Sequence, residues 1–157
     1  MSQDSRTDKP AIRVIPPAIA GLFLAAGIVL GWFLPLQPFA FWTGFFIGLL
    51  LALTGVVLVI WAIDTFVEKE TSVRIDRPAT SLITSGPYSF SRNPIYLGGA
   101  LGYVGIALIF NSGWALLFMI PLLSIIINKV IVPEETYLEN KFGETYLTYK
   151  ARVKRWL

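Results

Sequence analysis

Two short polar stretches of this chain carry the residue types that could do chemistry. The first runs from Ser85 to Gly98 and holds two prolines, two tyrosines, Arg92 and Asn93, and the second is Pro133-Glu134-Glu135. Guanidinium groups pair with carboxylates, and carboxylates accept charge-assisted hydrogen bonds from cations, so these residue types suit a small charged ligand. Because both stretches border long apolar segments, we predict that they meet at a membrane surface and form one site.

Both stretches also read as helix starts. Asn93-Pro94 is a turn signal, and a proline is tolerated in the first turn of a helix, where its missing N–H would be unpaired anyway. Glu134 and Glu135 follow Pro133 in the same way, and acidic residues favour the positive end of the helix dipole. Taken singly, each stretch therefore has an ordinary alternative: capping for the glutamates, and extension toward lipid phosphates for Arg92.

Composition narrows the class of protein. The chain has 157 residues, enough for one domain, with 55% hydrophobic residues and a mean hydropathy of +0.65, which is typical of a membrane protein. It contains no cysteine and no histidine. These absences exclude Ser-His and Cys-His nucleophilic catalysis and most zinc sites, so we expect no metal. A net charge of +3 is too small to suggest nucleic acid.

Charge-free stretches predict the membrane helices. Residues 14–63 and 93–128 contain no charged side chain, and a span needs about 20 residues. Two prolines break the first stretch at residues 35–38, and Asn111-Ser112-Gly113 breaks the second. We therefore predict four membrane helices, at residues 14–34, 39–63, 95–110 and 114–128. Glycines at helical spacing on the second and third of these would permit close helix packing: Gly44, Gly48, Gly55, Gly98, Gly102 and Gly105.

The remaining segments are polar. We predict a loose tail over residues 1–13 and a polar loop carrying the first motif over 64–94. Residues 129–157 are expected to form an amphipathic helix on the membrane surface, bent at Gly143. Its apolar positions recur at steps of three and four: Leu138, Phe142, Tyr146, Tyr149, Val153 and Trp156. The fold class is thus an all-α integral membrane protein of one domain, with about four transmembrane helices and an interfacial amphipathic helix.

The basic residues predict the orientation. Every lysine and arginine lies in the tail, in the polar loop or from Lys129 onward, and the turns at Pro35 and Asn111 carry none. The positive-inside rule then places both termini in the cytoplasm, in a protein of the bacterial inner membrane. A helical hairpin returns its two ends to one surface, so Asn93 and Val130 should be neighbours.

The joint pattern resembles the isoprenylcysteine carboxyl methyltransferase and phospholipid methyltransferase family of integral membrane enzymes. The matching residues are 82–88 (LITSGPY), 92–96 (RNPIY) and Glu134-Glu135, followed by Leu138, Phe142-Gly143, Tyr146, Tyr149 and Val153. The likeness covers residues 78–156. It departs from the carboxyl methyltransferases at Asn93, where they have histidine, and at Val130, where they have a substrate-contacting arginine.

The resemblance implies S-adenosylmethionine as the methyl-donating cofactor. Its contacting positions would be Leu82, Ile83, Tyr88, Asn93, Pro94, Ile95, Tyr96 and Glu134. Methyl transfer from a sulfonium needs positioning and electrostatics more than a histidine base. We expect Glu134 to accept hydrogen bonds from the donor's ammonium, and Arg92 to pair with a carboxylate of donor or acceptor. Glu135 is the expected proton acceptor for an amine substrate, so Arg92 and Glu135 are the predicted catalytic residues.

The acceptor is expected to be a lipophilic molecule, an isoprenoid or a lipid, that enters from the bilayer while the donor enters from the cytoplasm. Two alternatives stay open. Membrane sterol-type reductases share a similar proline-x-tyrosine motif and bind a nicotinamide cofactor, and a four-helix membrane scaffold would have no activity. A cofactor-binding assay separates the first alternative, and replacing Glu134 separates the second, because a scaffold would not need that carboxylate.

Overall fold

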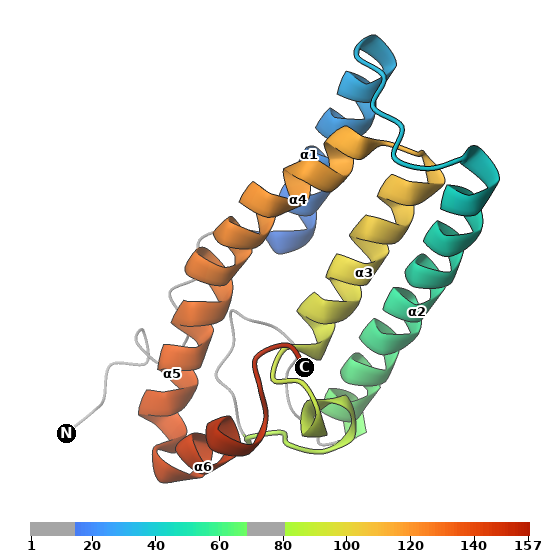
Figure 1. Cartoon of the computed structure of the whole chain (residues 1–157). Coiled ribbons are helices and arrows are strands. Elements are labelled where there is room, and N and C mark those ends of the chain that lie inside the picture. The colour runs from blue at the N-terminus through green and yellow to red at the C-terminus, as the bar shows by residue number, and fades with distance from the viewer. Residues whose placement is uncertain (1–14, 69–80) are drawn as a thin grey trace.

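The computed structural model describes residues 15–68 and 81–157, and all regular structure in these two ranges is helical (Figure 1). The predicted tail over residues 1–13 and the centre of the predicted polar loop lie outside the described residues. The helices are α1 (Pro16–Phe33), α2 (Phe41–Glu68), a 3-10 helix (Gly86–Ser89), α3 (Pro94–Ile109), α4 (Gly113–Ile126), a π-helical turn (Ile127–Ile131), α5 (Val132–Phe142) and α6 (Glu144–Arg152).

Three of the described helical stretches are long and apolar enough to cross a membrane. These are Pro16–Phe33, Phe41–Val67 and Gly113–Phe142, and Pro94–Ile109 is a shorter apolar helix. The predicted all-helical class with membrane-length apolar helices is therefore confirmed. The four-span topology stays a prediction, because α3, with 16 residues, is shorter than the others.

The fourth helix does not end at Asn128, as the sequence analysis expected. It continues through the π-helical turn into α5 and ends at Phe142. A proline inside a regular α-helix clashes with the carbonyl of the residue four positions earlier, and a wider π turn just before Pro133 relieves that conflict. At Gly143 the chain does bend, as predicted. The φ of this residue is +52°, in the region that favours glycine, and α6 starts at the next residue.

The second helix also runs past its predicted end at Ile63, to Glu68. The charged Asp64 does not interrupt it, since a single acidic residue on an exposed helix face is compatible with helical geometry. The buried face continues through Ala62 and Thr65, and the ring of Phe66 packs edge-on against Tyr88, with centroids 5.3 Å apart. The last turns of α2 therefore pack against the first motif.

Glycines join α2 to α3, as their spacing predicted. A Cβ atom added at Gly48 would lie 2.5 Å from the carbonyl oxygen of Gly105, and one at Gly55 would lie 2.5 Å from that of Gly98. The two backbones are thus in direct contact at two points, one above the other, which side chains would prevent. The helix face with Gly98 and Gly105 is therefore filled by α2.

Helices α1 and α4 form a second close pair. A Cβ at Gly27 would collide with the backbone of Ala115, and the hydroxyl of Ser112 donates to the carbonyl of Gly27 over 3.0 Å. In Figure 1, α2 and α3 run side by side, and α1 lies behind α4. We call the border between the α1–α4 pair and the α2–α3 pair the seam.

The two tight turns meet at one end of the bundle, which we call the turn end (residues 34–40 and 110–114). The side-chain amide of Asn111 donates to the carbonyl of Phe39 over 2.8 Å, and its oxygen accepts from the amide N–H of Phe39 over 3.3 Å. The N–H of Gly113 donates to the carbonyl of Leu36 over 2.7 Å. The opposite end, formed by residues 81–96 and 132–157, is called the site end (Figure 1).

Candidate functional site

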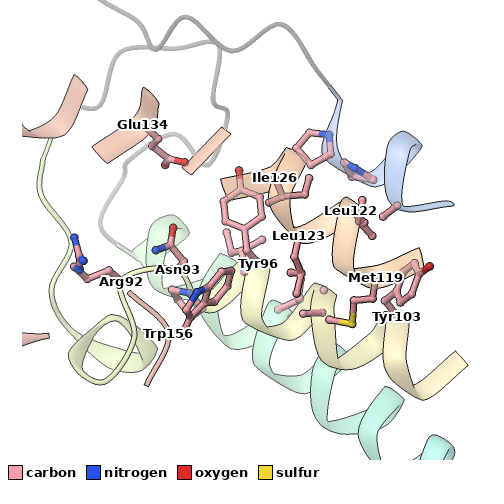
Figure 2. A pocket seen from close by; sticks show the side chains of 18 of the residues that line it. Arg92, Asn93, Tyr96, Tyr103, Met119, Leu122, Leu123, Ile126, Glu134 and Trp156 are labelled. Carbon is pink, nitrogen blue, oxygen red and sulfur yellow. The ribbon is translucent and has the colours of Figure 1, made fainter. Parts of the chain in front are cut away.

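A cavity of about 380 Å³ lies in the seam and reaches the site end. Its volume falls in the range of small-molecule sites. Its polar or aromatic lining residues at the site end are Phe66, Tyr88, Arg92, Asn93, Tyr96, Glu134 and Trp156. Figure 2 shows Arg92, Asn93 and Glu134 toward one end of the cavity, and Leu122, Met119 and Tyr103 toward the other. The cavity thus has a polar half and an apolar half.

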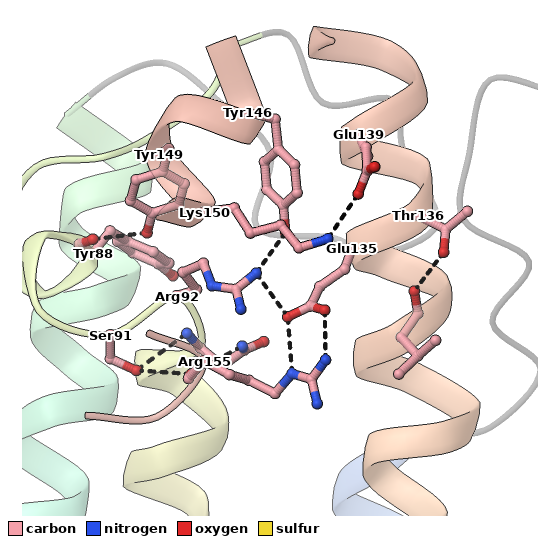
Figure 3. Close-up of polar contacts among 12 residues, drawn as sticks. Tyr88, Ser91, Arg92, Glu135, Thr136, Glu139, Tyr146, Tyr149, Lys150 and Arg155 are labelled. Carbon is pink, nitrogen blue, oxygen red and sulfur yellow. Dashed lines mark hydrogen bonds and ion pairs between the residues drawn. The ribbon is translucent and has the colours of Figure 1, made fainter. Parts of the chain in front are cut away.

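An ion-pair network of two buried side chains, Arg92 and Glu135, and the partly exposed Arg155 lies beside the polar half (Figure 3). Arg92 Nη1 lies 3.1 Å from Glu135 Oε1, and each of these two side chains is only 10% exposed. Arg155 grips the same carboxylate with two bonds, Nε to Oε1 at 3.0 Å and Nη2 to Oε2 at 2.8 Å. This hydrogen bonding with Glu135 raises the pKa of Arg155 above its usual value. Three segments of the chain are therefore joined at Glu135.

Glu134 has a different environment from its neighbour. Among the described residues its Oε2 is buried without a hydrogen-bond partner, and the same is true of Arg92 Nε. Both residues line the cavity. A buried polar atom without a partner costs roughly 1–3 kcal/mol, and more for a charged group. One unpaired acceptor and one unpaired donor at the same cavity suit a ligand that brings a donor and an acceptor of its own.

Two tyrosines of α6 form hydrogen bonds with the first motif beside the ion-pair network. Arg92 Nη1 donates to the hydroxyl of Tyr146 over 3.3 Å, and the hydroxyl of Tyr149 donates to the carbonyl of Tyr88 over 2.7 Å. Burial raises the pKa of Tyr149 and of Tyr88 well above the usual tyrosine value. Burial, followed by the nearby Glu135 carboxylate, also raises the pKa of Tyr146, and the hydrogen bond from Arg92 opposes it. These hydroxyls thus stay neutral.

The structure brings most of the predicted site residues together. Tyr88, Arg92, Glu134 and the whole segment 93–96 line the cavity. The lining does not include Leu82, Ile83 or Glu135. Ile83 is buried against Tyr88 and Ala62, so it supports a lining residue from behind. The predicted meeting of the two motifs is thus seen in the contact of Arg92 with Glu135, while the roles assigned to single residues stay predictions.

Sequence reasoning missed Arg155 and Trp156. The first binds Glu135, and the second lines the cavity. The only signal for them was that Trp156 continues the apolar stripe of residues 138–156 and that Arg155 lies in a basic run, which we interpreted as a membrane-facing helix. In the structure α6 ends at Arg152, so neither residue lies on that helix.

Comparisons with known proteins cover much of this region. The family model for phospholipid methyltransferases matches residues 43–145, about two-thirds of the chain. A protein of Haemophilus influenzae described only as uncharacterized is 38% identical over 64 residues, which make up 40% of this chain and 79% of that protein. No solved structure matches the chain. The chain belongs to the phospholipid methyltransferase family, and this membership implies a membrane methyltransferase that acts on lipid substrates.

Proposed function

We propose that the protein transfers a methyl group from S-adenosylmethionine to a lipophilic acceptor, an isoprenoid or a lipid, at the cytoplasmic face of the membrane. The observation that carries this proposal is a single cavity with two chemically different halves. One half is lined by Glu134 and Arg92, whose Oε2 and Nε atoms have no partner among the described residues, and the other is lined by apolar side chains such as Met119 and Leu122. A polar donor and a lipophilic acceptor each find a matching surface.

The residues at the polar half fit the methyl donor. Its amino-acid portion carries an ammonium and a carboxylate, which are the counterparts of an unpaired carboxylate oxygen and an unpaired guanidinium N–H. Glu134 would hold the ammonium and Arg92 the carboxylate, with Tyr88 and the 93–96 segment forming the walls. The bound donor supplies a methyl group already activated by its sulfonium. The chain's own work is to bind, orient and exclude water.

Glu135 is better suited to positioning than to accepting a proton. It lies outside the cavity lining, and both of its oxygens are occupied by guanidinium groups of Arg92 and Arg155. Through Arg92 it fixes the orientation of a residue that faces the ligand. A substrate that needs no base, such as a carboxylate, therefore fits the site better than an amine that must lose a proton.

The apolar half would receive the acceptor from the bilayer. Gly99 of α3 borders open space, since a Cβ added there would meet nothing within 4 Å. Gly99 also lines the cavity, together with Ala20 of α1. A hydrocarbon chain could approach the backbone of α3 closely along this side, between the two helix pairs.

The test of this function is binding and transfer by the detergent-purified protein. We expect S-adenosylmethionine to bind and its labelled methyl group to appear in a lipid fraction. Glu134→Gln should weaken donor binding by roughly tenfold or more, the scale of a hydrogen bond to a charged group. Glu139→Gln is the matched control, because Glu139 pairs with the exposed Lys150. Binding of a nicotinamide cofactor instead, or an unchanged affinity in folded Glu134→Gln, would contradict the proposal.

The orientation is proposed from the charge distribution and needs its own experiment. Ser112 at the turn end is buried and hydrogen-bonded to Gly27, so a cysteine there would label poorly. Gln37 at the same end is exposed. A cysteine introduced at Gln37 should react with an impermeant maleimide from outside intact cells. Labelling only after the cytoplasm is opened would reverse the proposed topology.

A further inference from the structure

The segment Val153–Leu157 leaves α6 and returns to the site. Val153 has an extended backbone, with φ −115° and ψ 125°, so α6 ends there and the residues after it are not helical. Figure 1 shows this last segment passing from α6 back toward the start of α3. Both Arg155 and Trp156 lie beyond residues 43–145, the part that the family model matches.

The segment is fastened to the first motif through its main chain. The N–H of Arg92 donates to the carbonyl of Lys154 over 3.0 Å. The carbonyl of Arg155 accepts from Asn93 Nδ2 at 3.1 Å and from Ser91 Oγ at 3.3 Å. Ser91 is fully buried, and Asn93 is 8% exposed. The side-chain amide of Asn93 is therefore hydrogen-bonded to this segment, although Asn93 also lines the cavity.

The segment is fastened to α5 as well, through the side chain of Arg155. Its two hydrogen bonds to Glu135, of 3.0 and 2.8 Å, join the segment to the helix that carries Glu134. Bidentate arginine–carboxylate pairs fix direction as well as distance. The next residue, Trp156, is consequently held from two sides. It lines the cavity and packs against the buried cluster that includes Ile126 and Val130.

We propose that Trp156 is a ligand-binding residue whose indole forms one wall of the polar half of the cavity and contacts the methyl donor, and that Arg155 is the positioning residue that holds it there. This rests on the proposed function. Figure 2 shows Trp156 beside Asn93 and Tyr96, on the side of the cavity that Arg92 and Glu134 share. An aromatic face attracts both a flat purine ring and a cationic sulfonium, and the methyl donor has both.

The experiment measures binding to the full chain in detergent by calorimetry. Its probes are S-adenosylmethionine and its demethylated product, S-adenosylhomocysteine. Trp156→Leu keeps an apolar side chain but removes the aromatic face, so the affinity for the product should fall about fivefold or more. Trp156→Phe restores a ring and should recover most of that loss. Trp42→Leu, at an exposed tryptophan (67% exposed) on α2 near the turn end, should change nothing.

A spectroscopic readout keeps the proposal testable if Trp156→Leu fails to fold. In protein containing 5-fluorotryptophan, the resonance missing from Trp156→Phe belongs to Trp156. Saturation with S-adenosylhomocysteine should shift this resonance and leave that of Trp42 in place. An unmoved Trp156 resonance in protein that binds the product, or full affinity in folded Trp156→Leu, would overturn the role of Trp156 alone. Wild-type protein that binds neither probe would overturn the proposed function itself.

Discussion

The two ends of the helical bundle differ in how completely their polar side chains are hydrogen-bonded. At the turn end, Asn111 gives and accepts hydrogen bonds with Phe39, and Trp114 Nε1 donates to the carbonyl of Leu34 over 2.7 Å. At the site end, Arg92 Nε and Glu134 Oε2 are buried and have no partner among the described residues. The polar side chains named at the turn end are paired within the protein, whereas the site end has one donor and one acceptor that a ligand could pair with.

This difference in pairing indicates that the site end is the less favourable of the two for the stability of the fold. Buried polar groups are ordinarily paired, and an unpaired one costs roughly 1–3 kcal/mol. The turn end meets the ordinary rule and fixes the two helix pairs relative to each other. Among the described residues, the site end departs from it at Glu134 Oε2 and Arg92 Nε, which belong to two residues that line the cavity. A ligand that forms hydrogen bonds with these two atoms would recover this free energy on binding. Substitutions at the two ends should therefore affect the stability of the fold and the affinity for the ligand differently.

The largest effect is expected for Glu135→Gln. This change leaves Arg92, whose side chain is 10% exposed, without its charged partner, and breaking a buried pair in this way costs about 3 kcal/mol. For a chain of this size the Tm should fall by roughly 6–12 °C, as measured by thermal unfolding in detergent. Donor affinity should fall too, since Arg92 loses its support. Glu139→Gln is the control, and an equal effect of the two changes would show that Glu135 is an ordinary surface charge.

A smaller effect, confined to stability, is expected for Asn111→Ala at the turn end. It removes both hydrogen bonds to Phe39 and places alanine at a φ of +48°, so unfolding should become easier by about 1–3 kcal/mol. Asn128→Ala, on an exposed asparagine whose side chain bonds to Ser124 among the described residues, should cost much less. Affinity for the donor should stay unchanged. A loss of affinity in folded Asn111→Ala would mean that the two ends are coupled.

Much of the fold was predictable because a membrane restricts the backbone to helices, and charge marks where the membrane ends. Residues 14–34 were predicted for α1, which spans Pro16–Phe33, and residues 95–110 for α3, which spans Pro94–Ile109. The ends at Ile63 and Asn128 were wrong for one shared reason. A charge ends an apolar stretch but does not by itself end a helix, so α2 continues past Asp64 and the chain stays helical past Lys129 as far as Gly143.

Helix geometry was enough to predict that the two motifs of the site lie together. A hairpin brings its ends together, so the encounter of Arg92 with the glutamate pair followed from the sequence. The different surroundings of Glu134 and Glu135 did not, because adjacent helical residues point about 100° apart and only packing decides which faces the cavity. Arg155 and Trp156 were misplaced, because Trp156 happens to continue the helical spacing of the apolar residues before it, although the chain is no longer helical after Arg152 and folds back onto Ser91–Asn93.

The smallest effect concerns a satisfied group at the site end, the hydroxyl of Tyr149 on the carbonyl of Tyr88. Burial raises the pKa of Tyr149 above its usual value, so the folded protein keeps this proton at a pH where the unfolded chain, with a tyrosine pKa of about 10, loses it. Its contribution to stability is therefore complete below about pH 10 and declines as the pH rises further.

Tyr149→Phe removes both the hydrogen bond and this titration. Near pH 8 the variant should be less stable by about 1 kcal/mol, the usual net value of one hydrogen bond. Above about pH 10 the Tm of the wild type should fall more steeply than that of the variant, and the two curves should converge. Thermal unfolding of both proteins from about pH 8 to pH 11 measures this. Curves that stay parallel would show that the hydroxyl of Tyr149 is accessible to water, and that the site end is open at α6 as well as at its cavity.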